Sequence, residues 1–245
     1  KKKTKLIRVM IISKHTPVMI NEAIEALNVR DKLDYIDVTF GGGSYSEEIL
    51  KKANCNLISI DRDPTVKKYA DKLKFKYKKR FTFVNKNFAF LDNIIKENNK
   101  NLVSGGIVAD LGVSSFQLDN SKRGFSFNKD GPLDMRMSGE GITAQELIYS
   151  LDEKEIARIL WDYGDEENSK AIAKMIVRER NKEVLDTTFK LVKLIKKVKK
   201  SYNKRKKHPA TKSFQALRIA TNKELIALEK LLMISEKILL PGARL

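Results

Sequence analysis

The chain has 245 residues, of which 49 are Lys or Arg and 31 are Asp or Glu, so its formal net charge is +18. Hydrophobic residues make up 42% of it, which suffices for a folded core and excludes a disordered tail, and the length suits one large domain or one domain with an insertion. One cysteine and two histidines exclude an internal disulfide and nearly exclude a Cys/His zinc site, and the charge makes a polyanion the expected large partner.

Residues 1–12 imitate a signal peptide, because basic residues precede apolar ones. Arg8 interrupts the apolar stretch and no small-residue cleavage site follows, so we reject a secretory signal. No apolar run approaches the roughly 18 residues that a membrane span needs, so we expect a reduced, soluble protein with no membrane partner. After a turn at His15-Thr16-Pro17, a helix is predicted over residues 18–27.

Short β-rich runs then alternate with helical patterns. Strands are predicted over residues 35–39, 57–60, 81–84 and 107–111, and helices over 46–52, from 63 onward and over 87–98. Ser46 is the expected N-cap of the first of these helices, and Pro64 suits the first helical position of the second. Cys55 precedes the second strand, and we expect it in the core. This alternation is typical of an α/β fold with a parallel sheet covered by helices on both faces.

The second half of the chain has helical periodicity alone over residues 137–200, which predicts a helical insertion. A long helix over 213–239 is expected to return to the sheet, and residues 241–245 resemble the turn into another strand. Residues 189–212 hold ten Lys and one Arg with no acid, and their apolar positions predict an amphipathic helix followed by a basic loop at 201–207. Such a surface suits phosphate contacts; a solvated face, or a lysine-rich composition, is the alternative.

A glycine loop, Gly41-Gly42-Gly43, lies between the first predicted strand and its helix, where glycines let a ligand approach the backbone closely. Asp61 follows the next strand, where a carboxylate can accept hydrogen bonds from both hydroxyls of a ribose. Together they favour a nucleoside-type cofactor over a tight structural turn. The loop lacks the third glycine of a dinucleotide site, and Asp37 precedes it, which suits the positive sulfonium and ammonium groups of S-adenosylmethionine better than a pyrophosphate.

The segment after the fourth strand reads DLGVSSFQLD over residues 110–119 and RGFSFNKDGPLDMR over residues 123–136. It lies where open α/β sheets place their chemistry. Its acids also fit a long ordered loop with Asp caps. Their spacing does not match an EF-hand, so a metal site is a minor alternative.

These two phrases, with HTPV at 15–18, DVTFG at 37–41, DRDP at 61–64 and HPATKSFQALRIATNKEL at 208–225, closely resemble the bacterial ribosomal RNA small subunit methyltransferase H (MraW) family. The resemblance implies a Rossmann-like class I S-adenosylmethionine methyltransferase core with an inserted helical domain. It implies methylation of the N4 amine of a cytidine in 16S rRNA near the decoding site, in the cytoplasm. The expected domains are 1–136 and 208–245 for the core and 137–207 for the insertion.

The resemblance also implies a set of cofactor-binding residues, namely Gly43, Ser44, Tyr45, Asp61, Phe88, Asp110 and Gln117, and no metal ligands. The family usually has Gly-Gly-His where this chain has Gly43-Ser44-Tyr45, so backbone contacts survive the change but a role of the histidine ring does not. Ala243 replaces a family glycine, and the family continues past Leu245. We therefore expect a fragment without its C-terminal core strands and with weak or absent activity.

For the reaction, Asp110 is the candidate catalytic residue, as acceptor of the amine proton, with pure cofactor binding as its alternative. Phe116, Phe125 or Phe127 are expected to line a pocket for the flipped base, or to belong to the core. His208, Lys212 and Arg218 are candidates for contacts with rRNA phosphates. A nicotinamide-dependent or other nucleotide-binding enzyme, and an RNA-binding protein that has lost catalysis, stay open as other classes. Nothing in the sequence indicates the oligomeric state.

Overall fold

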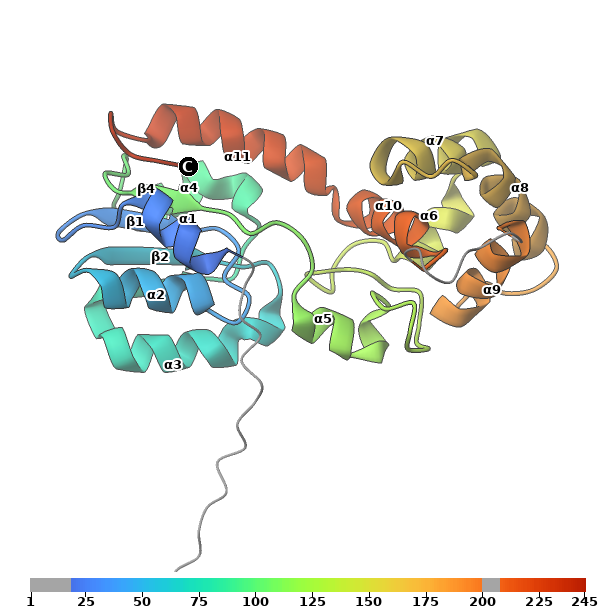
Figure 1. The fold of residues 1–245 in the computed structure, drawn as a ribbon, viewed down its shortest axis with the longest axis horizontal. Coiled ribbons are helices and arrows are strands. Elements are labelled where there is room, and N and C mark those ends of the chain that lie inside the picture. Colours follow the sequence, from blue (N-terminus) through green and yellow to red (C-terminus); the bar gives the residue numbers. More distant parts are fainter. Residues whose placement is uncertain (1–18, 200–207) are drawn as a thin grey trace, which may run out of the picture.

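The computed structural model describes residues 19–199 and 208–245, and it divides into a sheet unit and a helical unit (Figure 1). The expected turn at residues 15–17 and the basic loop at 201–207 lie outside the described residues. The sheet unit contains β1 (Asp34–Asp37), β2 (Asn56–Ile60), β3 (Phe81–Val84) and β4 (Gly106–Val108), with α1 (Ile20–Leu27), α2 (Ser44–Lys52), α3 (Lys67–Tyr77) and α4 (Leu91–Glu97). Three short 3-10 turns, Pro64–Val66, Lys78–Arg80 and Phe88–Phe90, connect these elements.

The four strands are all parallel, in the order β3-β2-β1-β4, so the α/β fold predicted from the alternating pattern is confirmed. The segment after the Pro241–Gly242 turn extends this order, because the Ile107 amide donates to the Arg244 carbonyl oxygen at 2.8 Å beside β4. The fourth strand is shorter than expected. It leaves the ladder after Val108, and the Asp110 amide instead donates to the Thr39 hydroxyl at 2.7 Å.

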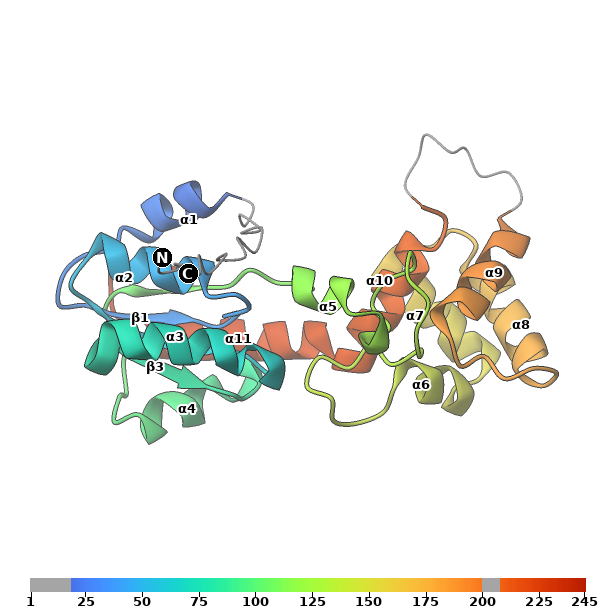
Figure 2. The ribbon, with the colours of Figure 1, turned by 90° about the horizontal axis from the view of Figure 1, so that it is seen from below.

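Helices cover both faces of the sheet because side chains alternate along each strand. Tyr35 joins the core formed with α1, α2 and α3, whereas its neighbour Ile36 joins the opposite core, formed with α4 and the C-terminal helix α11 (Glu224–Ile238). In Figure 1, α11 lies above the strands and α2 and α3 lie below them; Figure 2 views the same unit from below, with α3 in front of the strands. Cys55 is buried in the first of these cores, as expected.

The helical unit is built from α6 (Ala144–Ser150), α7 (Glu153–Gly164), α8 (Ser169–Arg180), α9 (Thr188–Val198) and α10 (Thr211–Asn222). Capping boxes begin two of these helices, with Thr143 paired to Glu146 in α6 and Asp152 paired to Glu155 in α7. A short helix, α5 (Ser115–Asp119), and a 3-10 turn, Ser121–Arg123, lie between the units. The expectation of a loop at 110–136 missed α5.

The single long helix expected over 213–239 is wrong. Lys223 adopts a left-handed conformation with φ 51°, and it separates α10 from α11. Around this break, Asn222 is buried, donates to the Met135 carbonyl oxygen at 2.7 Å and accepts from the Met137 amide at 2.8 Å. The two helices therefore serve different cores, since α10 packs on α7 and α11 packs on the sheet.

Side-chain packing bears on the expected domain boundaries. The core of the helical unit includes Phe125, Leu133, Met135 and the α10 residues Phe214 and Leu217, in addition to side chains of α6 to α9. We propose on this basis that the helical unit is larger than residues 137–207, and that it takes in residues 125–136 and α10.

Candidate functional site

A cleft of about 1240 Å³ opens at the carboxyl ends of β1, β2 and β4, where open parallel sheets bind their ligands. One wall is the loop after β1 and the start of α2. The other is the segment after β4 together with α5. Arg218 of α10 and Glu224 of α11 also line the cleft, so both units contribute to it.

Gly43 shapes the loop after β1. It is the left-handed residue that begins α2, with φ 81°, and a Cβ atom there would lie 2.8 Å from the ring of Phe40. Gly43 is buried and does not line the cleft, whereas the next two residues, Ser44 and Tyr45, do. Its role in the structure is therefore to place the N-terminal turn of α2 against the cleft.

The expected N-cap role of Ser46 is wrong, because α2 begins at Ser44 and no side chain caps it. Ser46 lies fully buried in the first turn. Its hydroxyl donates to Asp37 Oδ2 at 2.6 Å and lies 2.7 Å from the Ser59 hydroxyl. It ties the start of α2 to the ends of β1 and β2.

Asp37 is fully buried beneath the loop and does not line the cleft. Its second carboxylate oxygen accepts from the Thr39 amide at 3.0 Å. Burial raises the pKa of Asp37 to about 6, against the hydrogen bonds from Ser46 and Thr39, and the nearby charges of Asp61 and Asp110 act in the same direction as burial. Asp37 thus positions Thr39 through a hydrogen bond, and the Thr39 hydroxyl in turn accepts a hydrogen bond from the Asp110 amide.

Asp61 lies at the end of β2 and lines the cleft. Its two carboxylate oxygens accept from the Gly41 amide at 2.7 Å and the Asp63 amide at 2.8 Å. Burial raises the pKa of Asp61, against these two hydrogen bonds. Each oxygen still has a second lone pair, so the carboxylate can also accept hydrogen bonds from a ligand.

Asp63 accepts several hydrogen bonds at the site, and it was not a candidate from the sequence. Its carboxylate accepts from Thr65, from Gln117 Nε2 at 2.9 Å and from Arg123 at 2.9 Å. Burial acts to raise the pKa of Asp63, but the hydrogen bonds from Thr65 and Gln117 and the charge of Arg123 outweigh it and lower the pKa. Its Asp-Pro turn at the start of a helix was a visible signal for capping, but nothing in the sequence pointed to the partner Gln117.

Gln117 closes this network. With Ser114 it forms a capping box at the start of α5, and its side chain bridges from the Ser114 amide to Asp63. The segment after β4 is thereby fixed to the segment after β2. Gln117 lines the cleft with its amide already engaged, and Asp110 lines it as an exposed side chain.

Six of the seven expected cofactor-binding residues line one cleft, namely Ser44, Tyr45, Asp61, Phe88, Asp110 and Gln117. Of the expected aromatic pocket, only Phe116 lines it. Phe125 and Phe127 pack in the helical unit. The Phe127 ring stacks on the His208 ring, with centroids 4.5 Å apart and an angle of 2° between the ring planes.

The candidates for phosphate contacts have partners within the protein. Arg218 pairs with Glu224 at 2.8 Å and 3.0 Å, Lys212 donates to the Asp165 carbonyl oxygen, and His208 Nδ1 accepts from the Ala210 amide at 3.3 Å. Burial lowers the pKa of His208. Within residues 19–199 and 208–245, no group of three or more His, Cys, Asp or Glu is placed to hold a metal ion. In the same residues, no helix is long and apolar enough to cross a membrane.

Comparison with known proteins identifies relatives along nearly the whole chain. Residues 12–245 match the model of the MraW methylase family. The ribosomal RNA small subunit methyltransferase H of Rickettsia massiliae (strain Mtu5) is 47% identical over 235 residues, which are 96% of this chain and 75% of that protein. The protein of the same name from Rickettsia canadensis (strain McKiel) is 47% identical over 231 residues, 94% of this chain and 73% of its own. The chain therefore belongs to the MraW methylase family.

Proposed function

We propose that this protein uses S-adenosylmethionine to methylate the RNA of the small ribosomal subunit, at the N4 amine of a cytidine near the decoding site of 16S rRNA. The observation that carries the proposal is the place of Asp61. Its carboxylate lies beside the glycine loop at the end of β2, held by two backbone amides, in a cleft of about 1240 Å³. Family membership and the names of the relatives support the reaction class, and ribosomal RNA as substrate implies work in the cytoplasm.

The residues of the cleft fit the proposed cofactor. Asp61 offers carboxylate oxygens to the two hydroxyls of a ribose, and the Phe88 ring offers an apolar surface to an adenine. Asp110 and buried Asp37 make this end of the cleft negative, which favours the positive sulfonium and ammonium groups. When bound, S-adenosylmethionine supplies a methyl group that its positively charged sulfur already activates.

The protein contributes alignment and proton acceptance. The Asp37–Thr39–Asp110 hydrogen bonds fix the end of β4, and the Gln117–Asp63 bond fixes the segment that follows it. Holding two reactants in line lowers the entropic part of the barrier. An exocyclic amine is a weak nucleophile, and our candidate acceptor for the proton that the amine loses is Asp110, whose side chain is exposed in the cleft.

The basic surface of α9 supports RNA as the substrate. Leu191, Leu194 and Ile195 are buried, so the lysines at 193, 196 and 197 face outward. Lysines in such an arrangement contact phosphates and give affinity without reading the base sequence.

Three measurements test the proposal on the unmodified protein. Calorimetric titration should show binding of S-adenosylhomocysteine and none of NAD. Transfer of a labelled methyl group to small-subunit rRNA, followed by mass mapping of the nucleotide, should give N4-methylcytidine, at a low rate in view of the weak activity expected from the sequence. Cofactor binding and RNA binding without transfer would instead favour an RNA-binding protein that has lost catalysis.

Asp110 separates two roles in the same assay. Asp110→Ala should lower the transfer rate at saturating S-adenosylmethionine by about 100-fold, the order that a positioned proton acceptor contributes, in addition to any loss of affinity for S-adenosylhomocysteine. If cofactor affinity fell and transfer at saturating cofactor stayed intact, Asp110 would be a binding residue and not the acceptor.

A further inference from the structure

A second basic surface lies on α3, on the sheet unit. Residues 67–80 contain seven Lys and one Arg against a single Asp. Several of these cations are engaged within the protein: Lys67 pairs with Asp71 at 2.8 Å, Lys76 pairs with Glu47 at 2.8 Å, and Lys74 donates to the Phe81 carbonyl oxygen at 3.1 Å. These three lysines are therefore engaged in contacts within the protein.

Lys68 and Lys72 are arranged differently. Both are exposed, and no carboxylate lies within ion-pair distance of either ammonium group in the part of the chain that the structure describes. Their ammonium groups lie 5.0 Å and 5.9 Å from the centroid of the same ring, that of Tyr69. Two like charges thus gather around one aromatic side chain, an arrangement that an anion would stabilise.

Aromatic rings accompany these charges. The Tyr69 ring stacks on Phe116 of α5, with centroids 4.8 Å apart and planes 25° from parallel. Phe75 follows Lys68 and Lys72 on the same face of the helix, at the spacing i, i+4, i+7, and its side chain is 87% exposed. An almost fully exposed phenylalanine between lysines is unfavourable in water, and a stacking partner would cover it.

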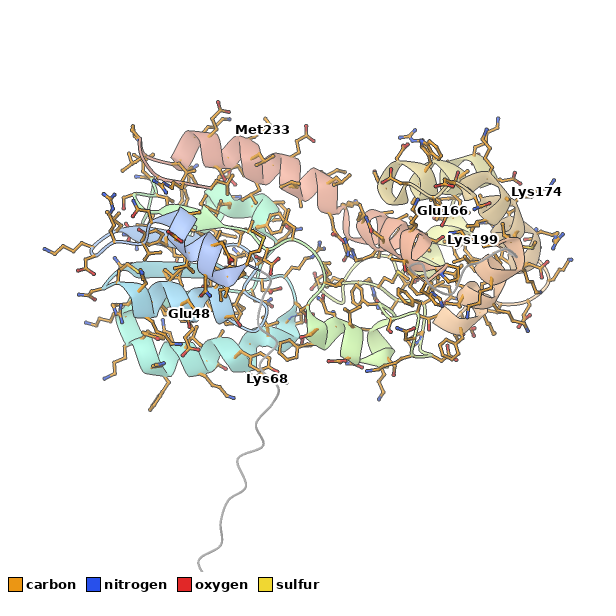
Figure 3. All side chains as sticks on the ribbon, in the orientation of Figure 1. Glu48, Lys68, Glu166, Lys174, Lys199 and Met233 are labelled. Atoms are coloured by element: carbon orange, nitrogen blue, oxygen red, sulfur yellow. The ribbon has the colours of Figure 1, made fainter. Side chains whose placement is uncertain are left out.

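This face begins at the cleft. Tyr69 and Phe116 both line it, and the Phe116 ring lies over the glycine loop, where a Cβ atom on Gly42 would approach it to 3.2 Å. Lys68, labelled in Figure 3, lies at the end of α3 that is next to α5. From there the row Lys68, Lys72 and Phe75 leads away from the cleft over the outside of α3.

We propose that Lys68, Lys72 and Phe75, with the Tyr69–Phe116 ring pair, form a binding surface for the single-stranded RNA that flanks the target nucleotide. The lysines contact its phosphates and the rings stack on its bases. Bases inside a duplex do not offer their faces to side chains, which is why the exposed ring selects a single strand. The inference rests on the proposed function. It adds an RNA-binding surface on the sheet unit to the basic surface of α9 on the helical unit.

The charge is tested with Lys68→Ala/Lys72→Ala, and the matched control is Lys170→Ala/Lys174→Ala. The control removes two exposed lysines at the same spacing from α8 of the helical unit, where Figure 3 labels Lys174. Binding to a small-subunit rRNA transcript is measured over a salt series. For two lost phosphate contacts to a single strand, the slope of log affinity against log salt should become shallower by about 1.4, with affinity about tenfold lower at low salt. The control should keep the slope of the unmodified protein.

The aromatic part is tested with Phe75→Ala. Because the side chain is exposed, the variant should fold like the unmodified protein, and thermal unfolding checks this. RNA affinity should fall by about five- to tenfold with an unchanged salt slope, because a lost stacking contact is not ionic. Trp161→Ala, which removes a 56% exposed aromatic from α7, is the control and should leave RNA affinity unchanged.

Binding of S-adenosylhomocysteine is measured for every protein in the series. If the unmodified protein binds rRNA and the two α3 variants bind it equally well with the same slope, the α3 surface is refuted while the proposed function stands. If the unmodified protein binds S-adenosylhomocysteine but not rRNA, the proposed function fails, and the α3 surface fails with it.

Discussion

Asp37 of the sheet unit and Glu166 of the helical unit are both buried carboxylates, and their surroundings are opposite. In the sheet unit, Asp37 is fully buried, its partners within the described part of the chain are hydroxyl and amide donors, and burial raises its pKa to about 6. In the helical unit, Glu166 is 1% exposed and pairs with Lys199 at 2.6 Å, labelled in Figure 3, while the Ser213 hydroxyl donates to it at 2.9 Å. One carboxylate is compensated by a cation and the other is not.

The two carboxylates have different roles. Lys199 also donates to the Pro209 carbonyl oxygen, so the Glu166 pair joins the ends of α9 and α10 to the turn between α7 and α8. Asp37 instead adds negative charge below the cleft with no compensating cation among the described residues, which destabilises the protein alone and would favour the positive ligand of the proposed function. We infer that the Glu166 pair stabilises the helical unit, whereas the charge of Asp37 costs the sheet unit some stability beneath its cleft.

The largest expected effect is that of Glu166→Ala, which leaves the half-buried Lys199 ammonium without its partner. The free energy of unfolding should fall by about 3 kcal/mol, the order measured when one partner of a buried ion pair is removed. Asp71→Ala, which breaks the exposed pair with Lys67, should change it by less than about 1 kcal/mol. Denaturant unfolding measures both. Equal changes in unfolding free energy for the two variants would show that the Glu166–Lys199 pair does not stabilise the helical unit, and the contrast with Asp37 would then be wrong.

Asp37→Asn should act in the opposite direction at neutral pH. The folded pKa of about 6 lies above the unfolded value, so the folded state binds more protons between these values and stability falls as the pH rises through this window. The amide of Asn can accept from the Thr39 amide through its oxygen and donate from its nitrogen to the Ser46 hydroxyl, which can then donate to Ser59, all without a charge. The variant should therefore gain up to about 3 kcal/mol relative to the unmodified protein between pH 4 and pH 7.

Urea unfolding of both proteins across this pH range checks the prediction. The difference in unfolding free energy should grow through the acidic range and level off above the folded pKa. A difference that does not depend on pH would mean that Asp37 is not titrating in the folded protein.

The sequence predicted best what depends on local pattern. Apolar runs located all four strands within a few residues, and strand–helix alternation predicted the parallel sheet. Elements fixed by distant contacts could not be predicted this way. Lys223 has no feature of a helix breaker, and the break there depends on the contacts of Asn222 with Met135 and Met137 and on the ion pair between Arg218 and Glu224.

The candidate site follows the same rule. The motifs brought the glycine loop, Asp61 and Asp110 together because the carboxyl ends of parallel strands meet at one edge of a sheet. The roles of Ser46 and Asp63 were missed because their partners, Asp37 and Gln117, lie on other elements. The pattern in the α3 sequence was visible, but only the ring stack with Phe116 shows that it adjoins the cleft.

Asp61→Asn tests the cleft of the sheet unit at intermediate magnitude. The amide keeps one acceptor oxygen for the Gly41 amide but loses the charge and half of its acceptors. Affinity for S-adenosylhomocysteine should fall by about 10- to 100-fold, as expected when a charged hydrogen-bond acceptor is lost, while RNA affinity is unchanged. Asp119→Asn, at the rim of the same cleft and exposed, is the control and should bind the cofactor product normally. Calorimetry measures both affinities. An equal loss in the two variants would mean that the overall negative charge of the cleft, and not the position of Asp61, determines the affinity.

The smallest effect concerns the joint between the units. Lys223 holds a left-handed conformation that strains a residue with a Cβ atom, and its amide already closes α10 by donating to the Ala220 and Ile219 carbonyl oxygens. Lys223→Gly should relieve the strain and raise the free energy of unfolding by about 0.5 kcal/mol, since the greater freedom of glycine in the unfolded chain offsets part of the gain. Glu229→Gly, in the exposed middle of α11, should instead lower it by about 1 kcal/mol. Opposite signs for two glycines a few residues apart would establish that the break is built into the fold, because a glycine stabilises only where the backbone is already left-handed. A loss of stability in both variants would mean that α10 and α11 form one continuous helix in solution, and the two units would then share a single rigid element.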